Sequence, residues 1–351
     1  MGPPPAVAQV RWAVRRGLDG LTGGDLVLAA CSGGADSLAL AAALAHEAPR
    51  RGLRAGGVTV DHGLQPGSAQ RARRIAAVLA ALGLDPVEAV PVTVAAGPGA
   101  GGPEAAARGA RYRALDEVAS RTGARAILLG HSLDDQAETV LLGLARGSGA
   151  RSLGGMPARR GHYRRPLLGV RRATLRAACD AAGLRPWDDP QNCDPAFARA
   201  RVRHQALPAL EAALGPGIAQ ALARTAGQLR SDAEALDEWA AGQAPLMRDP
   251  DGGWRADALR AAEPALRTRV LRTAAIEAGC PPGKLTAGHV GALDALVTNW
   301  HGQRWTTLPG GVRAMLRCDR LIFAVAAGHP PGPGGDSPGN RLASRETGKG
   351  R

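Results

Sequence analysis

A short run of small and polar residues lies between two apolar segments: Ser32, Gly33, Gly34, Ala35, Asp36 and Ser37. The glycines permit positive φ angles and expose backbone N–H groups, and a following helix would add the positive end of its dipole. The hydroxyls of Ser32 and Ser37 can donate hydrogen bonds to phosphate oxygens, and the Asp36 carboxylate can hold Mg²⁺. An ordinary turn with serine or aspartate as the helix cap would explain a lone pair of glycines. The complete string after a buried strand favours an anion-binding loop.

This loop lacks the lysine of the G-x-x-x-x-G-K-[ST] phosphate loops, where it reaches the phosphates between which a phosphoryl group moves. Its absence suits a site that releases pyrophosphate and transfers the adenylyl group. The string S-G-G-x-D-S resembles the pyrophosphate loop of the N-type ATP pyrophosphatases, and the resemblance implies ATP as a substrate. Members of that superfamily adenylate a carbonyl or carboxylate oxygen, and a nitrogen or sulfur nucleophile then displaces AMP.

Four further strings narrow the resemblance: VDHGLQPGSAQ (60–70), EAAARGARY (104–112), LGHSLDDQAETVLLGLARGSG (129–149) and DDPQNCDPAFARARVRHQALPAL (188–210). In their order and spacing they closely resemble the tRNA(Ile)-lysidine synthase family, strongly over about residues 25–215 and weakly to about residue 300. The third string is the most specific. The chain departs from the family at Gly102, where asparagine is frequent, and it resembles the short members, which lack an additional C-terminal domain.

The resemblance implies a ligase that acts on isoleucine tRNA with a CAU anticodon. ATP with Mg²⁺ would adenylate the C2 oxygen of the wobble cytidine and release pyrophosphate. The ε-amine of free L-lysine would then attack C2 and expel AMP, which gives lysidine. The target base must be splayed into a pocket, as sequence-specific recognition of RNA usually requires.

Carboxylates open the helix that follows the fourth apolar run, with Asp134 and Glu138 at i,i+4 and Asp135 and Glu138 at i,i+3. An acidic first turn is favoured by the helix dipole alone, and Asp134 needs no further role. The resemblance assigns catalytic work to Asp135 and Glu138, together with Asp36 and Arg111. It makes Asp36 and Asp135 the expected metal ligands. Either Asp135 or Glu138 would bind the lysine ammonium and later accept its proton.

Residues at two strand ends complete the expected nucleotide site. Asp61 and His62 end the second apolar run, where adenine or ribose would lie, and Gly130 and His131 end the fourth. A plain transition from strand to loop, or a structural histidine, would explain the same residues.

Residues of two helices are expected to contact the tRNA: Glu104, Arg108, Arg111, Tyr112, Arg201 and Arg203. A surface ion pair would explain Glu104 and Arg108 equally well, whereas the resemblance places Arg111 toward the target base or phosphates. Arg201 and Arg203 form a basic stripe, which could also be a solvated helix face. If Arg203 contacts a phosphate, its removal should lower the salt dependence of binding by about one counterion.

The elements that must carry these residues alternate between strand and helix up to about residue 150. Continuous apolar runs predict strands buried on both faces at 25–32, 56–62, 87–94 and 124–131. Helical segments lie between or after them at 36–48, 68–83, 104–121 and 133–146. This alternation predicts an α/β fold with a doubly wound parallel sheet. Its strand ends would bring residues 32, 62 and 131 to the edge where ligands bind in such sheets.

The rest of the chain is expected to be mainly helical, at 171–183, 199–213, 216–242, 257–279 and 285–299. The strings QRWTTLPG, GVRAMLRCD and RLIFAVAA predict a small β-meander after them. We expect a catalytic domain at 1–215, a smaller tRNA-binding domain at 216–327 and a disordered tail at 328–351. The Gly/Pro string at 94–104 is typical of a linker or an active-site flap.

Composition limits the classes of partner. The formal net charge is +13, which favours nucleic acid or an acidic membrane surface, although a genomic bias toward arginine, alanine and glycine could produce part of the arginine count. No window reaches the roughly 18 apolar residues that span a bilayer, so we expect a cytoplasmic protein without a membrane partner. The sequence does not indicate an oligomeric state.

Two other functions stay open at this point. A pyrophosphate-loop tRNA thiolase would use sulfur, but the five cysteines include no C-x-x-C pair, and Cys31 lies in a buried strand where a thiol behaves as a small hydrophobe. A basic RNA-binding protein could hold nucleotide in the loop without chemistry. Release of AMP that needs both tRNA and lysine would separate the three.

Overall fold

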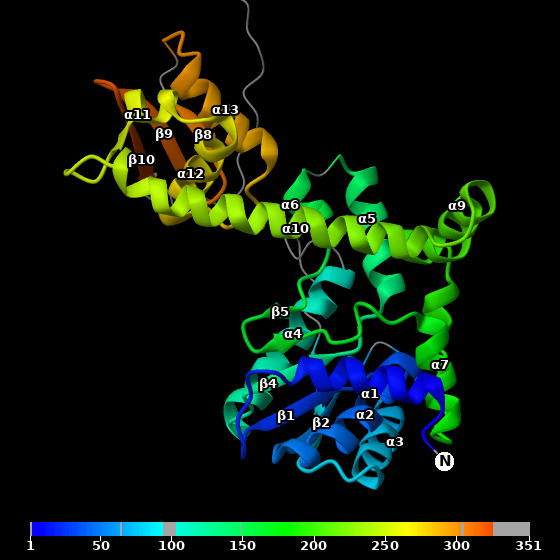
Figure 1. The fold of residues 1–351 in the computed structure, drawn as a ribbon. Helices are drawn as coiled ribbons and strands as arrows, with labels where there is room; N and C mark the ends of the chain where they lie inside the picture. Colours follow the sequence, from blue (N-terminus) through cyan, green and yellow to red (C-terminus); the bar gives the residue numbers. More distant parts are fainter. Residues whose placement is uncertain (1, 64, 94–102, 148, 303–304, 326–351) are drawn as a thin grey trace, which may run out of the picture. The chain divides into compact units, whose positions relative to one another are not determined.

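The structure is a computed structural model that describes residues 2–63, 65–93, 103–147, 149–302 and 305–325 (Figure 1). It divides into two compact units, residues 1–234 and residues 235–351, and the division falls within helix α10 (Ile218–Gln243). The expected domain boundary at 215 precedes that helix. The expected tail at 328–351 and most of the flap at 94–104 lie outside the described residues.

A six-stranded sheet in the order β3-β2-β1-β4-β6-β5 forms the centre of the first unit. Its strands are β1 (Leu26–Ala30), β2 (Arg54–Asp61), β3 (Val87–Pro91), β4 (Ala126–Leu129), β5 (Arg159–Arg160) and β6 (Tyr163–Arg164). All neighbours are parallel except β5 and β6. The register aligns Ala30 with Val58 and Leu129, so the chain leaves β1, β2 and β4 at one edge. The predicted doubly wound sheet is confirmed, with its order reversing at β1.

Helices cover both faces of this sheet (Figure 1). The predicted helices are present as α2 (Ala35–Glu47), α3 (Ser68–Ala81), α4 (Pro103–Thr122) and α5 (Leu133–Ala145). On one face, α2 packs with α1 (Pro5–Gly17) and α7 (Arg172–Ala181) around the buried Leu44 and Leu175. On the other face, Leu115 of α4 packs against the strands. The helix α1 was not predicted, because its buried stripe is short.

The predicted helix at 199–213 contains an irregular turn. It is built from α8 (Ala198–Arg201), a π-helical turn (Val202–Ala206) and α9 (Leu207–Leu214), while α6 (Ala150–Leu153) lies earlier in the chain. The Leu207 N–H donates to the Val202 carbonyl, five residues back. Proline at position 208 has no N–H with which to continue the α-helical pattern, and the helix widens in the turn before it.

The second unit combines helices with a small antiparallel sheet. Its elements are α11 (Ala256–Ala261), α12 (Pro264–Glu277), α13 (Ala287–Thr298), β7 (Trp254–Arg255), β8 (Thr306–Leu308), β9 (Val312–Arg317) and β10 (Arg320–Val325). The sheet order is β7-β10-β9-β8, which confirms the predicted meander and adds β7. The predicted helix at 257–279 is divided between α11 and α12, because Pro264 disfavours helical backbone in the residue before it. Across the described residues, no helix combines the length and apolar character needed to cross a membrane.

A pair of glycine substitutions tests the packing of the sheet. A Cβ added at Gly56 would lie 2.6 Å from the Pro86 carbonyl oxygen and 2.6 Å from Leu28 Cδ2, and that carbonyl accepts a ladder hydrogen bond from Gly57. We expect Gly56→Ala to destabilise the protein by about 1–3 kcal/mol, as overpacked sites do. In the control Gly109→Ala, the nearest atom is the Arg113 guanidinium at 3.5 Å. This change within a helix should leave the melting temperature unchanged or raise it; equal melting temperatures for the two variants would contradict the packing described.

Candidate active site

The loop between β1 and α2 has the geometry of an anion site. Gly33 has φ +87°, and a Cβ on it would lie 2.7 Å from Ile75 Cδ1, so only glycine fits there without strain. Gly34 is the N-cap of α2, which has no side-chain cap. The Ser37 hydroxyl donates to the Gly34 carbonyl at 2.9 Å and accepts from the Ser32 N–H at 3.2 Å. No serine or aspartate side chain therefore caps the first turn of α2, and the positive end of the helix dipole lies open at the sheet edge.

Two other segments lie against this loop. A Cβ at Gly130, after β4, would lie 3.2 Å from the Ser37 backbone, which explains the glycine at that strand end. The Trp187 N–H donates to the Gly33 carbonyl at 2.9 Å, and the Arg71 guanidinium stacks on the Trp187 ring at 4.0 Å. A cavity of about 410 Å³ lies between them, lined by Gly33, Leu38, Gly67, Gln70, Arg71, Arg74, Ile75, Val78, Arg185, Pro186 and Trp187. The loop thus adjoins a basic cavity large enough for a small-molecule ligand.

Asp135 is held by its own helix and by two arginines. Ser132 caps α5 in a capping box, and its N–H and hydroxyl both donate to Asp135 Oδ2, at 2.8 and 2.9 Å. The other carboxylate oxygen, Oδ1, accepts from Arg172 at 2.7 Å and from Arg203 at 3.4 Å. Both oxygens of this buried side chain are therefore in use.

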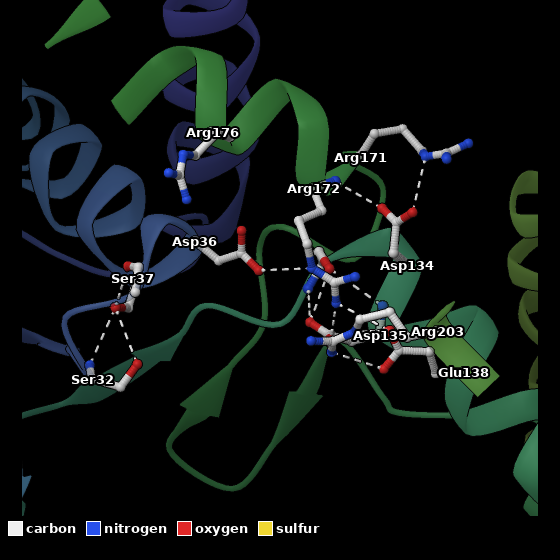
Figure 2. A network of polar contacts seen from close by, with 12 residues as sticks. Ser32, Asp36, Ser37, Asp134, Asp135, Glu138, Arg171, Arg172, Arg176 and Arg203 are labelled. Atoms are coloured by element: carbon white, nitrogen blue, oxygen red, sulfur yellow. Dashed lines mark hydrogen bonds and ion pairs between the residues drawn. The ribbon is translucent and has the colours of Figure 1, made fainter. Parts of the chain in front are cut away.

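Glu138 lies one turn further along α5 and is fully buried. Arg203 forks onto it, with Nε 2.7 Å from Oε1 and Nη2 3.1 Å from Oε2 (Figure 2). Arg172 donates to Oε1 at 3.2 Å, and Arg199 forms an ion pair at 3.5 Å. Three guanidinium groups from two separate segments thus offset the cost of burying this carboxylate.

Two further carboxylates connect α7 to the site. Asp36 of the loop faces Arg172 at 3.6 Å. Asp134 accepts from the Arg172 backbone N–H at 2.7 Å and pairs with Arg171 at 3.2 Å. Asp134 therefore anchors the N-terminus of α7, a role that the acidic first turn alone did not predict.

Burial and ion pairs act in opposite directions on these carboxylates. Burial raises the pKa of Asp36 to about 6, although Arg172 partly opposes the shift. Burial also acts to raise the pKa of Asp135, but Arg172 and the Ser132 N–H outweigh it and hold that pKa below its usual value. Asp135 is therefore ionised at neutral pH.

Six buried side-chain nitrogens of the first unit have no hydrogen-bond partner among the described residues, and three of them belong to expected site residues: His62 Nδ1, Arg111 Nε and His131 Nδ1. Burial lowers the pKa of His131 to about 3, and burial and Arg111 lower that of His62, so both rings are neutral near pH 7. Burial likewise lowers the pKa of Arg111. Unsatisfied buried nitrogens are rare in folded proteins, and they fit a polar ligand.

The remaining expected residues have other contacts than those of the carboxylate cluster. Asp61 accepts from the Gly63 N–H at 3.0 Å at the end of β2. The Tyr112 ring packs edge-on against Tyr163, and the exposed Arg108 lies over it at 5.1 Å. The side chain of Glu104 lies outside the described residues.

The two arginines of the expected basic stripe point to different partners. Arg201 is exposed and donates to the carbonyls of Pro195 and Ala196. Arg203 is only 19% exposed and is turned onto Glu138.

Sequence reasoning missed Arg172 and Arg199. A signal for Arg172 was present, because arginine at the N-terminus of a helix opposes the dipole and so indicates an acidic partner nearby. Its partners Glu138 and Asp135 lie 34 and 37 residues away in the sequence, so a local pattern could not identify them.

One carboxylate fits a magnesium ion. Within the described ranges, no group of three or more His, Cys, Asp or Glu side chains is arranged to hold a metal. Magnesium in nucleotide sites commonly uses one or two carboxylates together with substrate phosphates. Asp36 has a single ion pair and stands on the loop, whereas Asp135 would have to release an arginine to share the ion.

A parallel sheet that reverses at β1, with an S-G-G-x-D-S loop at its edge, defines a nucleotide-binding protein of the PP-loop class. The family described as PP-loop domain matches residues 13–210, and the TilS substrate binding domain matches residues 255–321. A tRNA(Ile)-lysidine synthase of Thermobifida fusca is 60% identical, with 92% of this chain and 99% of that protein covered. One from Streptomyces coelicolor is 55% identical over the same shares. The chain belongs to the tRNA(Ile)-lysidine synthase family, as its motifs indicated.

A solved structure shares the fold alone. The U34-tRNA thiolase NcsA from Methanococcus maripaludis, with its [4Fe-4S] cluster, has a TM-score of 0.53 and 19% identity. The alignment covers 64% of this chain and 80% of that one.

The two loop glycines allow a matched test of the anion site. Gly33→Ala should lower the melting temperature, because the new Cβ meets Ile75 and the backbone is left-handed. Gly34→Ala should keep the melting temperature, since the nearest atoms lie at 3.9 Å, but it should weaken ATP binding by filling the phosphate cradle. Calorimetry and an ATP titration would check both. Normal ATP affinity in Gly34→Ala would show that phosphates do not approach this backbone.

Proposed function

We propose that this chain ligates free L-lysine to C2 of the wobble cytidine in isoleucine tRNA with a CAU anticodon, in the cytoplasm, where all three substrates occur. The observation that carries this proposal is the match to tRNA(Ile)-lysidine synthases over nearly their whole length. The site supports it, because a pyrophosphate loop adjoins a buried pair of carboxylates. The second unit, which includes the match to a substrate binding domain, contacts the tRNA.

The loop binds the ATP phosphates. Backbone N–H groups around Gly34 and the first turn of α2 face the anion, and Ser32 supplies a hydroxyl, while the Ser37 hydroxyl donates to the Gly34 carbonyl and holds the loop. Asp36 would hold Mg²⁺ with the phosphates. The ion, when bound, neutralises charge on the departing pyrophosphate.

The target base is held next to these phosphates. The unpartnered nitrogens of His62, Arg111 and His131 supply hydrogen bonds to the splayed cytidine or to the nucleotide. Because both imidazoles are neutral, each ring offers one donor and one acceptor, while Arg111 offers donors only. The C2 oxygen attacks the α-phosphorus, and the bond to pyrophosphate breaks.

Asp135 and Glu138 bind the ε-ammonium of lysine and remove its proton. The free amine attacks C2 and forms the carbon–nitrogen bond. The carbon–oxygen bond then breaks, and the oxygen leaves with AMP. An ionised carboxylate is required for this step, and the lowered pKa of Asp135 supplies one at neutral pH.

The substitution Asp36→Ala tests the adenylation step. Release of pyrophosphate and of AMP should both fall to background, because the loop loses the carboxylate that would hold the ion. Thin-layer assays with labelled ATP, tRNA and lysine measure both products. The control is Asp188→Ala, an exposed carboxylate paired with Arg176 on the surface, which should keep activity. Near-normal pyrophosphate release by Asp36→Ala would refute the assignment.

Cys31 tests the thiolase alternative. Its thiol is buried, burial raises its pKa, and it belongs to no group of three or more described His, Cys, Asp or Glu side chains that could hold a metal. We expect Cys31→Ala to retain lysine-dependent modification of the tRNA within a few-fold of the wild-type rate. A persulfide on Cys31, or loss of modification in a variant that still folds and binds ATP, would favour sulfur transfer.

A further inference from the structure

Arg172 is the guanidinium that connects the pyrophosphate loop to the carboxylate pair. It lies 2.7 Å from Asp135, 3.2 Å from Glu138 and 3.6 Å from Asp36, and its side chain is 29% exposed (Figure 2). Its backbone is fixed, because its N–H donates to Asp134. Rotation of the side chain can therefore change its partners without movement of α7.

The cluster around Arg172 is balanced in formal charge. Its four carboxylates are Asp36, Asp134, Asp135 and Glu138, and its four guanidinium groups are Arg171, Arg172, Arg199 and Arg203. An added ammonium finds no net negative charge there. It can pair with Asp135 or Glu138 only by replacing a guanidinium, because an extra buried cation without a counter-charge is costly.

The arginines paired with Glu138 differ in how strongly they are held there. Arg203 forks onto both oxygens of Glu138, and Arg199 also donates to Thr139 at 3.0 Å. Among the described residues, neither forms a hydrogen bond or an ion pair with the loop, although the charge of Arg203 acts on Asp36 from further away. Arg172 holds Glu138 through one nitrogen and has its Nε toward Asp36. It is the guanidinium placed to respond when nucleotide binds at the loop.

We infer that Arg172 is a positioning residue that couples the two substrate sites, an inference that rests on the proposed function. Before nucleotide binds, Arg172 neutralises Asp135 and Glu138 and excludes the lysine ammonium. The triphosphate brings negative charge to the loop and attracts Arg172 away from the carboxylate pair. Asp135 and Glu138 then each lose one cationic partner, and the lysine ammonium takes its place. ATP therefore binds before lysine, and lysine binding without nucleotide is weak.

Calorimetric titration of lysine, with and without Mg²⁺ and α,β-methylene-ATP, tests this coupling. The unmodified enzyme should bind lysine about tenfold or more tightly with the nucleotide present, within the usual range of coupling between sites. Arg172→Gln should bind lysine equally well in both conditions, and more tightly than the unmodified enzyme without nucleotide.

The neighbouring residue provides a matched control. Arg171→Gln removes the same charge from the same helix turn, but Arg171 pairs with Asp134 and donates otherwise to Gln220. It should keep the coupling. Loss of coupling in Arg171→Gln would show a general effect of charge and overturn the inference, as would retention of full coupling in Arg172→Gln.

A second variant guards against misfolding of Arg172→Gln. Arg172→Lys keeps the charge but loses the planar fork that reaches several carboxylates at once, so its coupling should be present and smaller than in the unmodified enzyme. Full coupling in this variant would contradict the role of the fork. The outcomes also separate the two proposals. Lysine that binds tightly in the unmodified enzyme regardless of nucleotide refutes only the coupling, whereas AMP release independent of lysine refutes the proposed function.

Discussion

The burial of two carboxylates on α5 is the constraint from which the site's architecture follows. Removing Asp135 and Glu138 from water costs several kcal/mol for each ion unless counter-charges and hydrogen bonds replace the solvent. Arg172, Arg199 and Arg203 supply those counter-charges from segments far along the chain. Two arginines accordingly stand at the start of helix α7, although the helix dipole disfavours them there. Arg203 lies in the π-helical turn and points toward Glu138. Contacts with these arginines thus keep the two carboxylates buried.

The same constraint explains why ATP and lysine chemistry meet at one sheet edge. The pyrophosphate loop needs bare backbone N–H groups at the start of α2, and the strand order places the start of α5 beside it. In the proposed function, one helix start attracts phosphates, while the other carries the carboxylates that attract the lysine ammonium. Arg172 stands between them, so the two charges are separated and yet linked. His62 and His131, which end β2 and β4, are both neutral at this edge, because burial lowers the pKa of each ring.

The sequence predicted the parts of this arrangement that depend on local pattern. Continuous apolar runs identified four of the five parallel strands, β6 being the exception, and their alternation with helices identified the edge that holds Ser32, His62 and His131. Long-range pairing was not accessible, because nothing local shows which carboxylate Arg172 or Arg199 will meet. The basic stripe was wrong in its geometry: Arg201 and Arg203 are two residues apart, and such neighbours lie on different faces of a helix. Whether either residue contacts tRNA stays a prediction.

In the proposed reaction, the C2 oxygen of the wobble cytidine is adenylated and leaves with AMP. The most direct measurement uses tRNA with ¹⁸O at that oxygen, incubated with the enzyme, ATP and lysine for a single turnover. Mass spectrometry of the nucleotide product then locates the label. We predict ¹⁸O in the phosphate of AMP and none in the modified base. Unlabelled AMP, with ¹⁸O retained in the tRNA, would contradict it.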